Sequence, residues 1–266
     1  MKKISREMLD AVYDRYNKKE LISPDPLEFL FYYENIKDRE IAGLIAACLA
    51  YGKVTQILKS VDAVLSRMGE SPSDFIDSHT LKDFTKIYKD FKHRFTTGSE
   101  LANFLYGIKN VIRNYGSLEA CFDEGFDGSA ETVHAALTGF TLKLTESSEM
   151  SKNSLLPDPS RGSACKRLHL FLRWMIRSDE VDPGGWKNSY SAKLIVPLDT
   201  HMYRFARFYG FTLRKSADLV AASEITAGFR RLCPDDPVKY DFALTRFGIR
   251  HELNWEILDG IMRDFA

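Results

Sequence analysis

Two residues in the second half of the chain have the types and settings needed for covalent chemistry at a carbon atom. Lys166 follows residues 159–162, which favour a turn, and opens a strongly apolar helix. Asp199 follows Pro197 and precedes a helix that starts at Thr200. We interpret Lys166 as a nucleophile and Asp199 as its partner carboxylate.

The expected positions of these two residues give the interpretation a physical basis. The positive end of a helix dipole disfavours an ammonium group, so the field at a first turn, with partial burial, would lower the pKa of Lys166 and leave more free amine to attack. Aspartate is a preferred N-cap, which would hold Asp199 rigidly at the start of its helix. The plainer alternatives are a solvated Lys166 and an Asp199 that only caps a helix.

Two sequence segments carry a resemblance to a known superfamily. They are Gly162-Ser-Ala-Cys-Lys166, before an apolar helix, and Val196-Pro-Leu-Asp-Thr-His-Met-Tyr-Arg204. Both look like segments of the helix-hairpin-helix DNA glycosylases, and are nearest to the archaeal-type 8-oxoguanine DNA glycosylase/AP lyases. The whole chain also resembles a bacterial family of conserved proteins without an assigned function, over residues 38–58, 163–177, 194–207 and 236–249.

The glycosylase resemblance implies an activity, a site and a partner. It implies an all-α, two-lobed fold that removes a damaged base, 8-oxoguanine above all, from duplex DNA in base-excision repair. Lys166 would form a Schiff base with the sugar, Asp199 would stabilise the developing positive charge, and β-elimination would give AP lyase activity. The residues expected to contact DNA are Gly162, Ser163, Ala164, Arg167, Lys53, Gln56, His201 and Arg204.

Ala164 departs from the pattern of the resembling hairpins, which have a second glycine at this position. A tight hairpin lying against a phosphate needs the backbone freedom of glycine. We therefore expect Ala164 to weaken the grip of the hairpin on DNA more than it affects Lys166.

Four residues are candidates for the pocket that receives the damaged base: Tyr51, Phe95, Trp186 and Asp241. Tyr51 follows a helix rich in small residues and lies in the turn that fills the DNA gap in the resembling enzymes. Burial of Tyr51 and Phe95 in the core is the alternative, and Trp186 would equally attach its Gly-rich loop to the core. Asp241 would lie on the last long helix, or be a solvated charge.

Net charge argues mildly against a nucleic-acid partner. The chain of 266 residues has 37 Lys and Arg and 37 Asp and Glu, whereas nucleic-acid binders usually carry a basic excess. However, residues 161–177 contain five basic and no acidic residues, so positive charge is expected beside the proposed site. Two other classes stay open: a non-catalytic helix-hairpin-helix DNA-binding protein, and a helical protein that binds RNA or another protein.

The cysteines, Cys48, Cys121, Cys165 and Cys233, show no metal-ligand spacing, and the four-cysteine iron–sulfur loop of the endonuclease III-like relatives is missing. No metal or cofactor is expected. The N-terminus reads as neither signal peptide nor membrane span, so we expect a cytoplasmic, monomeric protein without a membrane partner.

Hydrophobic periodicity and capping residues predict an all-α fold, because strand alternation persists nowhere. We treat residues 1–266 as a single unit with a central lobe at about 40–150 and a hairpin lobe formed by 1–39 and 151–266. Helices are expected at about 4–20, 26–31, 39–51, 53–68, 72–77, 100–114, 118–122, 133–145, 166–177, 200–210, 216–232 and 238–250.

Overall fold

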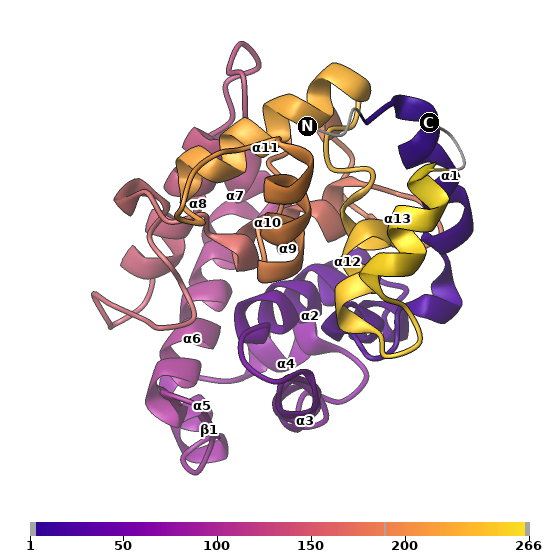
Figure 1. Cartoon of the computed structure of the whole chain (residues 1–266). Helices are drawn as coiled ribbons and strands as arrows, with labels where there is room; N and C mark the ends of the chain where they lie inside the picture. Colours follow the sequence, from indigo (N-terminus) through magenta and orange to yellow (C-terminus); the bar gives the residue numbers. More distant parts are fainter. Residues whose placement is uncertain (1–3, 189, 264–266) are drawn as a thin grey trace.

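The computed structural model shows helices packed around one buried helix, α2 (Figure 1). It describes residues 4–188 and 190–263. Four short 3-10 helices (η) and one small hairpin complete the structure. The elements are α1 Arg6–Tyr16, η1 Lys19–Leu21, η2 Pro26–Tyr32, α2 Ile36–Leu49, α3 Val54–Leu65, α4 Pro72–Ser78, α5 Leu81–Ile87, β1 Lys92–His93, β2 Thr96–Thr97, α6 Gly98–Tyr115, α7 Leu118–Glu124, α8 His134–Glu146, η3 Pro159–Arg161, α9 Lys166–Ile176, η4 Ser191–Lys193, α10 Thr200–Tyr209, α11 Leu219–Leu232, α12 Asp241–Ile249 and α13 Trp255–Arg263.

The prediction of a mostly helical protein is confirmed, although individual elements differ from it. The antiparallel hairpin β1–β2 was not expected, because strands of two residues are too short to show alternation. Helices α5 and α13 were also missed, and α12 begins at Asp241 rather than at about 238, since residues 237–240 form turns. The division into two lobes stays a prediction.

Helix α2 lies at the centre because small side chains allow its neighbours to come close. It packs against η2 and α9. A Cβ atom at Gly43 would lie 3.2 Å from Leu30 Cδ2 and 3.5 Å from Met175 Sδ, so both neighbours already touch the α2 backbone. The small residues of α2 therefore allow close packing on both neighbours, and α9 is fixed against α2.

Helix α2 begins before residue 39, where the sequence predicts its start. The helix starts one turn earlier, where Asn35 accepts a hydrogen bond from the Lys37 amide at 2.9 Å. Asp38 is buried inside the first turn and accepts hydrogen bonds from the Ser73 amide at 2.8 Å and the Ser71 hydroxyl at 3.1 Å. Its carboxylate therefore links α2 to α4 instead of capping its own helix.

The two ends of the described chain pack together. Helix α1 contacts both α12 and α13, which places the indigo and yellow ends of the chain side by side in Figure 1. Buried apolar side chains from Met8 to Met262 form one connected core. Among the helices described, none has both the length and the apolar composition that crossing a membrane requires.

Candidate active site

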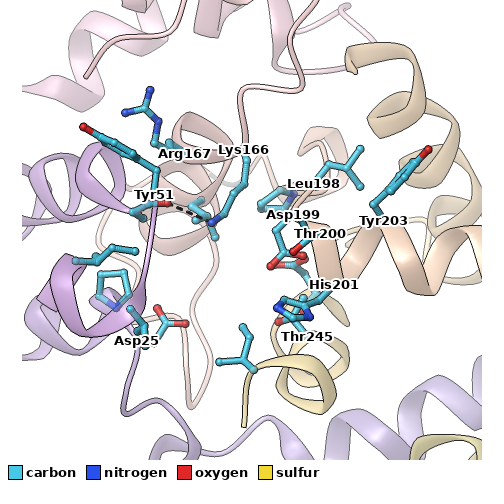
Figure 2. Close-up of a pocket in the computed structure, with 18 of the residues that line it drawn as sticks. Asp25, Tyr51, Lys166, Arg167, Leu198, Asp199, Thr200, His201, Tyr203 and Thr245 are labelled. Carbon is cyan, nitrogen blue, oxygen red and sulfur yellow. Dashed lines mark hydrogen bonds between the residues drawn. The ribbon is translucent and has the colours of Figure 1, made fainter. Parts of the chain in front are cut away.

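A cavity of about 690 Å³ opens where segments from distant parts of the sequence meet. Its size is in the range of sites for small organic groups. The walls come from residues 24–26, the turn after α2, the segment before α9, the start of α10, and α12. Figure 2 shows Lys166 extending into this space from one side and Asp199 and His201 from the other. The two residues singled out from the sequence thus line the same cavity.

Lys166 is the first residue of α9, and the end of α2 holds its amine. Nζ donates a hydrogen bond to the carbonyl oxygen of Ala50 at 3.3 Å. Ala50 is the C-cap of α2, so the amine contacts one of the last carbonyl groups of that helix. The side chain of Lys166 is therefore oriented by a second helix as well as by its own.

Arg167, expected to contact DNA, makes structural contacts at the same helix end. Its guanidinium donates to the carbonyl oxygens of Cys48 at 2.5 Å and Ser154 at 2.9 Å. It also lies over the Tyr51 ring, 4.8 Å from the centroid. The side chain joins α2 to the loop before the hairpin while it lines the cavity.

Asp199 caps α10 as its sequence setting predicts. Its Oδ1 accepts a hydrogen bond from the Met202 amide at 2.7 Å, and Gly210 ends the same helix in the left-handed conformation. Asp199 and His201 both line the cavity. The cap fixes the carboxylate in place without removing it from the cavity wall.

A second carboxylate, Asp241, lies on the cavity wall and is buried. One of its oxygens accepts a hydrogen bond from Arg173, and no partner for the other oxygen, Oδ1, is found among the described residues. Burial raises the pKa of Asp241 to about 6, as does the charge of Asp199, whereas Arg173 lowers it. The cavity wall thus contains two carboxyl groups, Asp199 and Asp241, in different surroundings.

Arg173 belongs to a buried ion-pair network that the sequence reading did not foresee. It pairs with Asp182 at 3.1 Å and with Asp241, while Arg177 pairs with Asp236 at 2.9 Å and with Asp182. The expectation of concentrated positive charge beside the site therefore needs correction. Two of the five basic residues in 161–177 are neutralised by acids further along the chain.

Tyr51 lines the cavity, whereas Phe95, which was also expected in the base pocket, lies outside the cavity lining and contacts Tyr51. The Tyr51 hydroxyl bonds to Thr96 Oγ1 at 2.5 Å and to the His93 carbonyl at 3.1 Å, and Tyr51 lines the cavity. Phe95 stacks on Tyr51 with ring centroids 5.0 Å apart. The alternative that Phe95 belongs to the core is wrong, since 63% of its surface is exposed.

The segment before α9, residues 162–165, is joined to α11. The carbonyl of Gly162 accepts a hydrogen bond from the Leu219 amide at 2.9 Å, and Ser163 forms a bridge with Asp218. Gly162 and Cys165 adopt the left-handed conformation, with φ of 76° and 41°. Ala164 is buried and lies outside that region, so its position does not require the freedom of glycine.

Several expected site residues lie outside the cavity lining. Lys53 is exposed, and Gln56 donates to Ser60 at 3.3 Å beside a smaller hollow. The guanidinium of Arg204 covers the Trp255 ring, 5.1 Å from the centroid. The placement of Trp186 in the base pocket is corrected: this residue is buried in the core, where its indole donates to Glu40 at 3.1 Å.

The cavity also includes residues that sequence reasoning overlooked or named only in passing. Arg246 pairs with Asp25 at 2.9 Å, which ties α12 to the segment before η2. Thr245 lies one turn after Asp241 and donates to the Asp241 carbonyl at 2.9 Å. In the sequence, the one indication that Thr245 and Arg246 would lie near Asp241 was their spacing from it on the predicted last long helix. The further lining residues include Pro24, Asp25, Arg173, Thr245, Arg246 and Gly248.

Comparison with known proteins places the chain in a family. The model of the family described as "Protein of unknown function (DUF2400)" matches residues 25–250. The chain belongs to this family. The matched range covers every residue that lines the cavity except Pro24. Searches of curated proteins and of solved structures found no match.

Proposed function

We propose that this protein is a DNA N-glycosylase with AP lyase activity that removes an oxidised purine, with 8-oxoguanine as the first candidate. The observation that carries the proposal is the placement of Lys166 and Asp199 on two walls of one cavity, each at the start of a helix. The likeness of residues 162–166 and 196–204 to the helix-hairpin-helix DNA glycosylases supports the same assignment.

The mechanism uses the free amine of Lys166 as a nucleophile. A nucleotide flipped out of duplex DNA enters the cavity. Nζ attacks C1′ of the sugar, the bond from C1′ to the base breaks, and the base leaves with the electron pair and takes up a proton. The carboxylate of Asp199 stabilises the positive charge that develops on the sugar.

The covalent intermediate then loses its 3′ phosphate. The sugar ring opens to an iminium ion on Lys166, a proton leaves C2′, and the C3′–O bond breaks with departure of the phosphate. Water hydrolyses the remaining imine and restores the amine. The buried Asp241, with its unpaired oxygen on the cavity wall, is a further group for accepting or returning a proton at this site.

The starting contacts of Lys166 indicate what substrate binding must change. Its amine is hydrogen-bonded to Ala50 at the end of α2 and must leave this carbonyl to reach C1′. The hairpin at 162–164 would place backbone amides against a phosphate, and Lys53 and Arg204 would contact the DNA backbone. Tyr51 would bound the pocket that receives the base.

A binding role without chemistry is the second candidate. The chain has a formal net charge of zero, and Arg173 on the cavity wall is paired with the buried carboxylates of Asp182 and Asp241. Both observations reduce the electrostatic attraction to a polyanion. A helical protein that binds RNA or another protein through this family fold would account for them.

Borohydride trapping tests the enzymatic proposal. The purified protein is incubated with duplexes that contain 8-oxoguanine or an abasic site, and borohydride reduces any imine to a stable amine linkage. We expect a covalent protein–DNA adduct with the unaltered protein and none with Lys166→Ala. Lys152→Ala, which removes an exposed lysine away from the cavity, serves as the matched control and should form the adduct normally.

Each other result has a definite meaning. An adduct that persists in Lys166→Ala would remove Lys166 from the proposed role. The absence of an adduct with either duplex, while the protein still binds them, would favour the non-catalytic candidate. Thermal unfolding followed by circular dichroism establishes that each variant is folded.

A further inference from the structure

The tip of the β1–β2 hairpin presents an aromatic ring to solvent beside the cavity. Phe95 lies between the two strands and is 63% exposed. The ring stacks on Tyr51 with an interplanar angle of 24°. An exposed phenylalanine held flat on a second aromatic ring presents a rigid apolar surface for stacking.

Tyr51 is held firmly enough to support this ring. Its hydroxyl forms hydrogen bonds to two residues of the β1–β2 hairpin, the Thr96 hydroxyl and the His93 carbonyl. The guanidinium of Arg167 lies over its ring. The imidazole of His93 in turn contacts Ser60 at 2.8 Å and the Tyr51 carbonyl at 3.0 Å. These contacts fix the hairpin to the turn that lines the cavity.

The backbone of the hairpin tip is strained in a way that orients its side chains. Arg94 has φ of 53°, a left-handed conformation that is costly for a residue with a long side chain. Its side chain lies on Gly52, where a Cβ atom would be 2.9 Å from Arg94 Cδ. Strained residues of this kind tend to occur at binding sites.

The surroundings of Phe95 carry positive charge. Arg94, Lys92 and Lys53 are all exposed on the hairpin and the adjoining turn. A flat apolar ring beside cationic side chains matches a nucleobase and its phosphate, because stacking is indifferent to base identity and the cations bind the backbone.

We propose that Phe95, Tyr51 and Arg94 form a stacking site for a DNA base that has lost its pairing partner. This proposal rests on the proposed function. Tyr51 borders both the cavity and Phe95, so a flipped nucleotide in the cavity and an unpaired base on Phe95 would lie on two sides of one residue. Arg94 and Lys53 bind the phosphates on either side of that base.

A binding assay without chemistry tests the site. The probes are a fully paired duplex and a duplex with one tetrahydrofuran abasic analogue opposite 2-aminopurine, which leaves the fluorescent base unpaired and cannot form an imine. We expect Phe95→Ala to bind the abasic duplex at least about tenfold more weakly than the unaltered protein, with less than a twofold change for the paired duplex. Stacking on Phe95 should quench 2-aminopurine, and this quenching should vanish in Phe95→Ala.

Two further variants make the result specific. Phe95→Trp keeps a stacking ring and should retain binding and quenching. Tyr32→Ala removes another exposed aromatic ring, 68% exposed on η2 and outside the cavity lining, and should bind as the unaltered protein does. Equal losses in Phe95→Ala and Tyr32→Ala, or a Phe95→Ala variant with unchanged affinity and quenching, would overturn the stacking site.

The result is separable from that of the borohydride experiment. Phe95-dependent binding without a trapped adduct would retain the stacking site and remove the proposed chemistry. A trapped adduct, together with a DNA affinity that does not depend on Phe95, would retain the proposed chemistry and remove the stacking site. Failure to bind either duplex would overturn the stacking site.

Discussion

The imidazole ring of His201 lies directly against the backbone of Gly248. A Cβ atom at position 248 would be 2.0 Å from His201 Nδ1 and 2.6 Å from Cγ. The contact joins α10 to α12 at the cavity wall, where both residues lie. Because the ring occupies the place of a side chain on α12, the absence of a side chain at Gly248 determines where His201 can be.

We expect Gly248→Ala to destabilise the protein by about 1–3 kcal/mol, because the added methyl group overpacks this contact. In a His201→Ala background the ring is gone, and Gly248→Ala should be neutral or stabilising by up to about 1 kcal/mol, since alanine favours a helix more than glycine does. Urea unfolding of the four proteins in this double-mutant cycle measures the effect. An equal loss in both backgrounds would contradict the contact.

Two substitutions of Asp199 should distinguish its role as a helix cap from its proposed role in catalysis. Asn caps a helix as well as Asp does, so Asp199→Asn should unfold at nearly the same urea concentration as the unaltered protein. Asp199→Ala should lose about 0.5–2 kcal/mol with the cap. Both variants lack the negative charge, so both should form the borohydride adduct at least about 100-fold more slowly if Asp199 stabilises the sugar cation.

Ser117→Ala is the matched control for lost stability. Ser117 caps α7, where its hydroxyl accepts from the Ala120 amide at 3.0 Å, and it is outside the cavity lining. This variant should lose a similar free energy of unfolding and trap DNA at the normal rate. A normal rate in Asp199→Asn would leave Asp199 with its structural role alone.

Local signals predicted the parts of the fold that local interactions determine. Asp199 and Gly210 bound α10 as expected, because an N-cap and a left-handed glycine act within one turn of the helix. The prediction for α2 was wrong by one turn because Asn35 and Asp38 are both capping residues. The choice depends on the Ser73 amide, which binds Asp38 from far along the chain.

The charges and aromatic residues of the site were harder to predict because their partners are remote in sequence. From the sequence, Arg173 is expected to be an exposed cation between apolar neighbours. In the structure it is buried and pairs with Asp241, 68 residues away. Phenylalanine is a residue type usually found in the core, yet Phe95 lies at the tip of the β1–β2 hairpin and is exposed. Trp186 was ambiguous between loop and core until Glu40 was found at its indole nitrogen.

Glu40 should make stability depend on pH. Its carboxyl group is buried and accepts hydrogen bonds from the Leu118 and Glu119 amides and from Trp186. Burial outweighs these bonds and raises its pKa from 4.5 to about 7. Between these pH values the folded protein holds a proton that the unfolded chain has released. The free energy of unfolding should therefore fall as the pH rises through this window, by up to about 3 kcal/mol.

Glu40→Gln removes this titration, so its urea midpoint should change less between pH 5 and pH 8 than that of the unaltered protein. Glu131→Gln is the control, because the Glu131 side chain is 88% exposed and should leave the pH dependence as it was. A pH dependence that is identical in Glu40→Gln would show that another group is responsible.

In the segment before α9, residues 162–165, the effect of a substitution on the free energy of unfolding should depend on the backbone φ of the residue replaced. Gly162 has φ of 76°, and a methyl group added there would have no neighbour within 4 Å, so Gly162→Ala should cost about 1–2 kcal/mol through conformation alone. Gly128 is equally open and its φ lies outside the left-handed range, so Gly128→Ala should change the free energy of unfolding by less than about 0.5 kcal/mol.

The residue next to Lys166 that adopts the left-handed conformation is Cys165, whereas Ala164 lies outside that region. Cys165→Ala and Cys165→Gly both remove the buried sulfur, but only glycine relieves the backbone, so Cys165→Gly should be the more stable of the two by about 1 kcal/mol. Ala164→Gly relieves nothing and should lower stability slightly without strengthening DNA binding. Tighter binding by Ala164→Gly would instead show that the alanine restrains the hairpin against a phosphate, as the comparison with glycine-containing hairpins led us to expect.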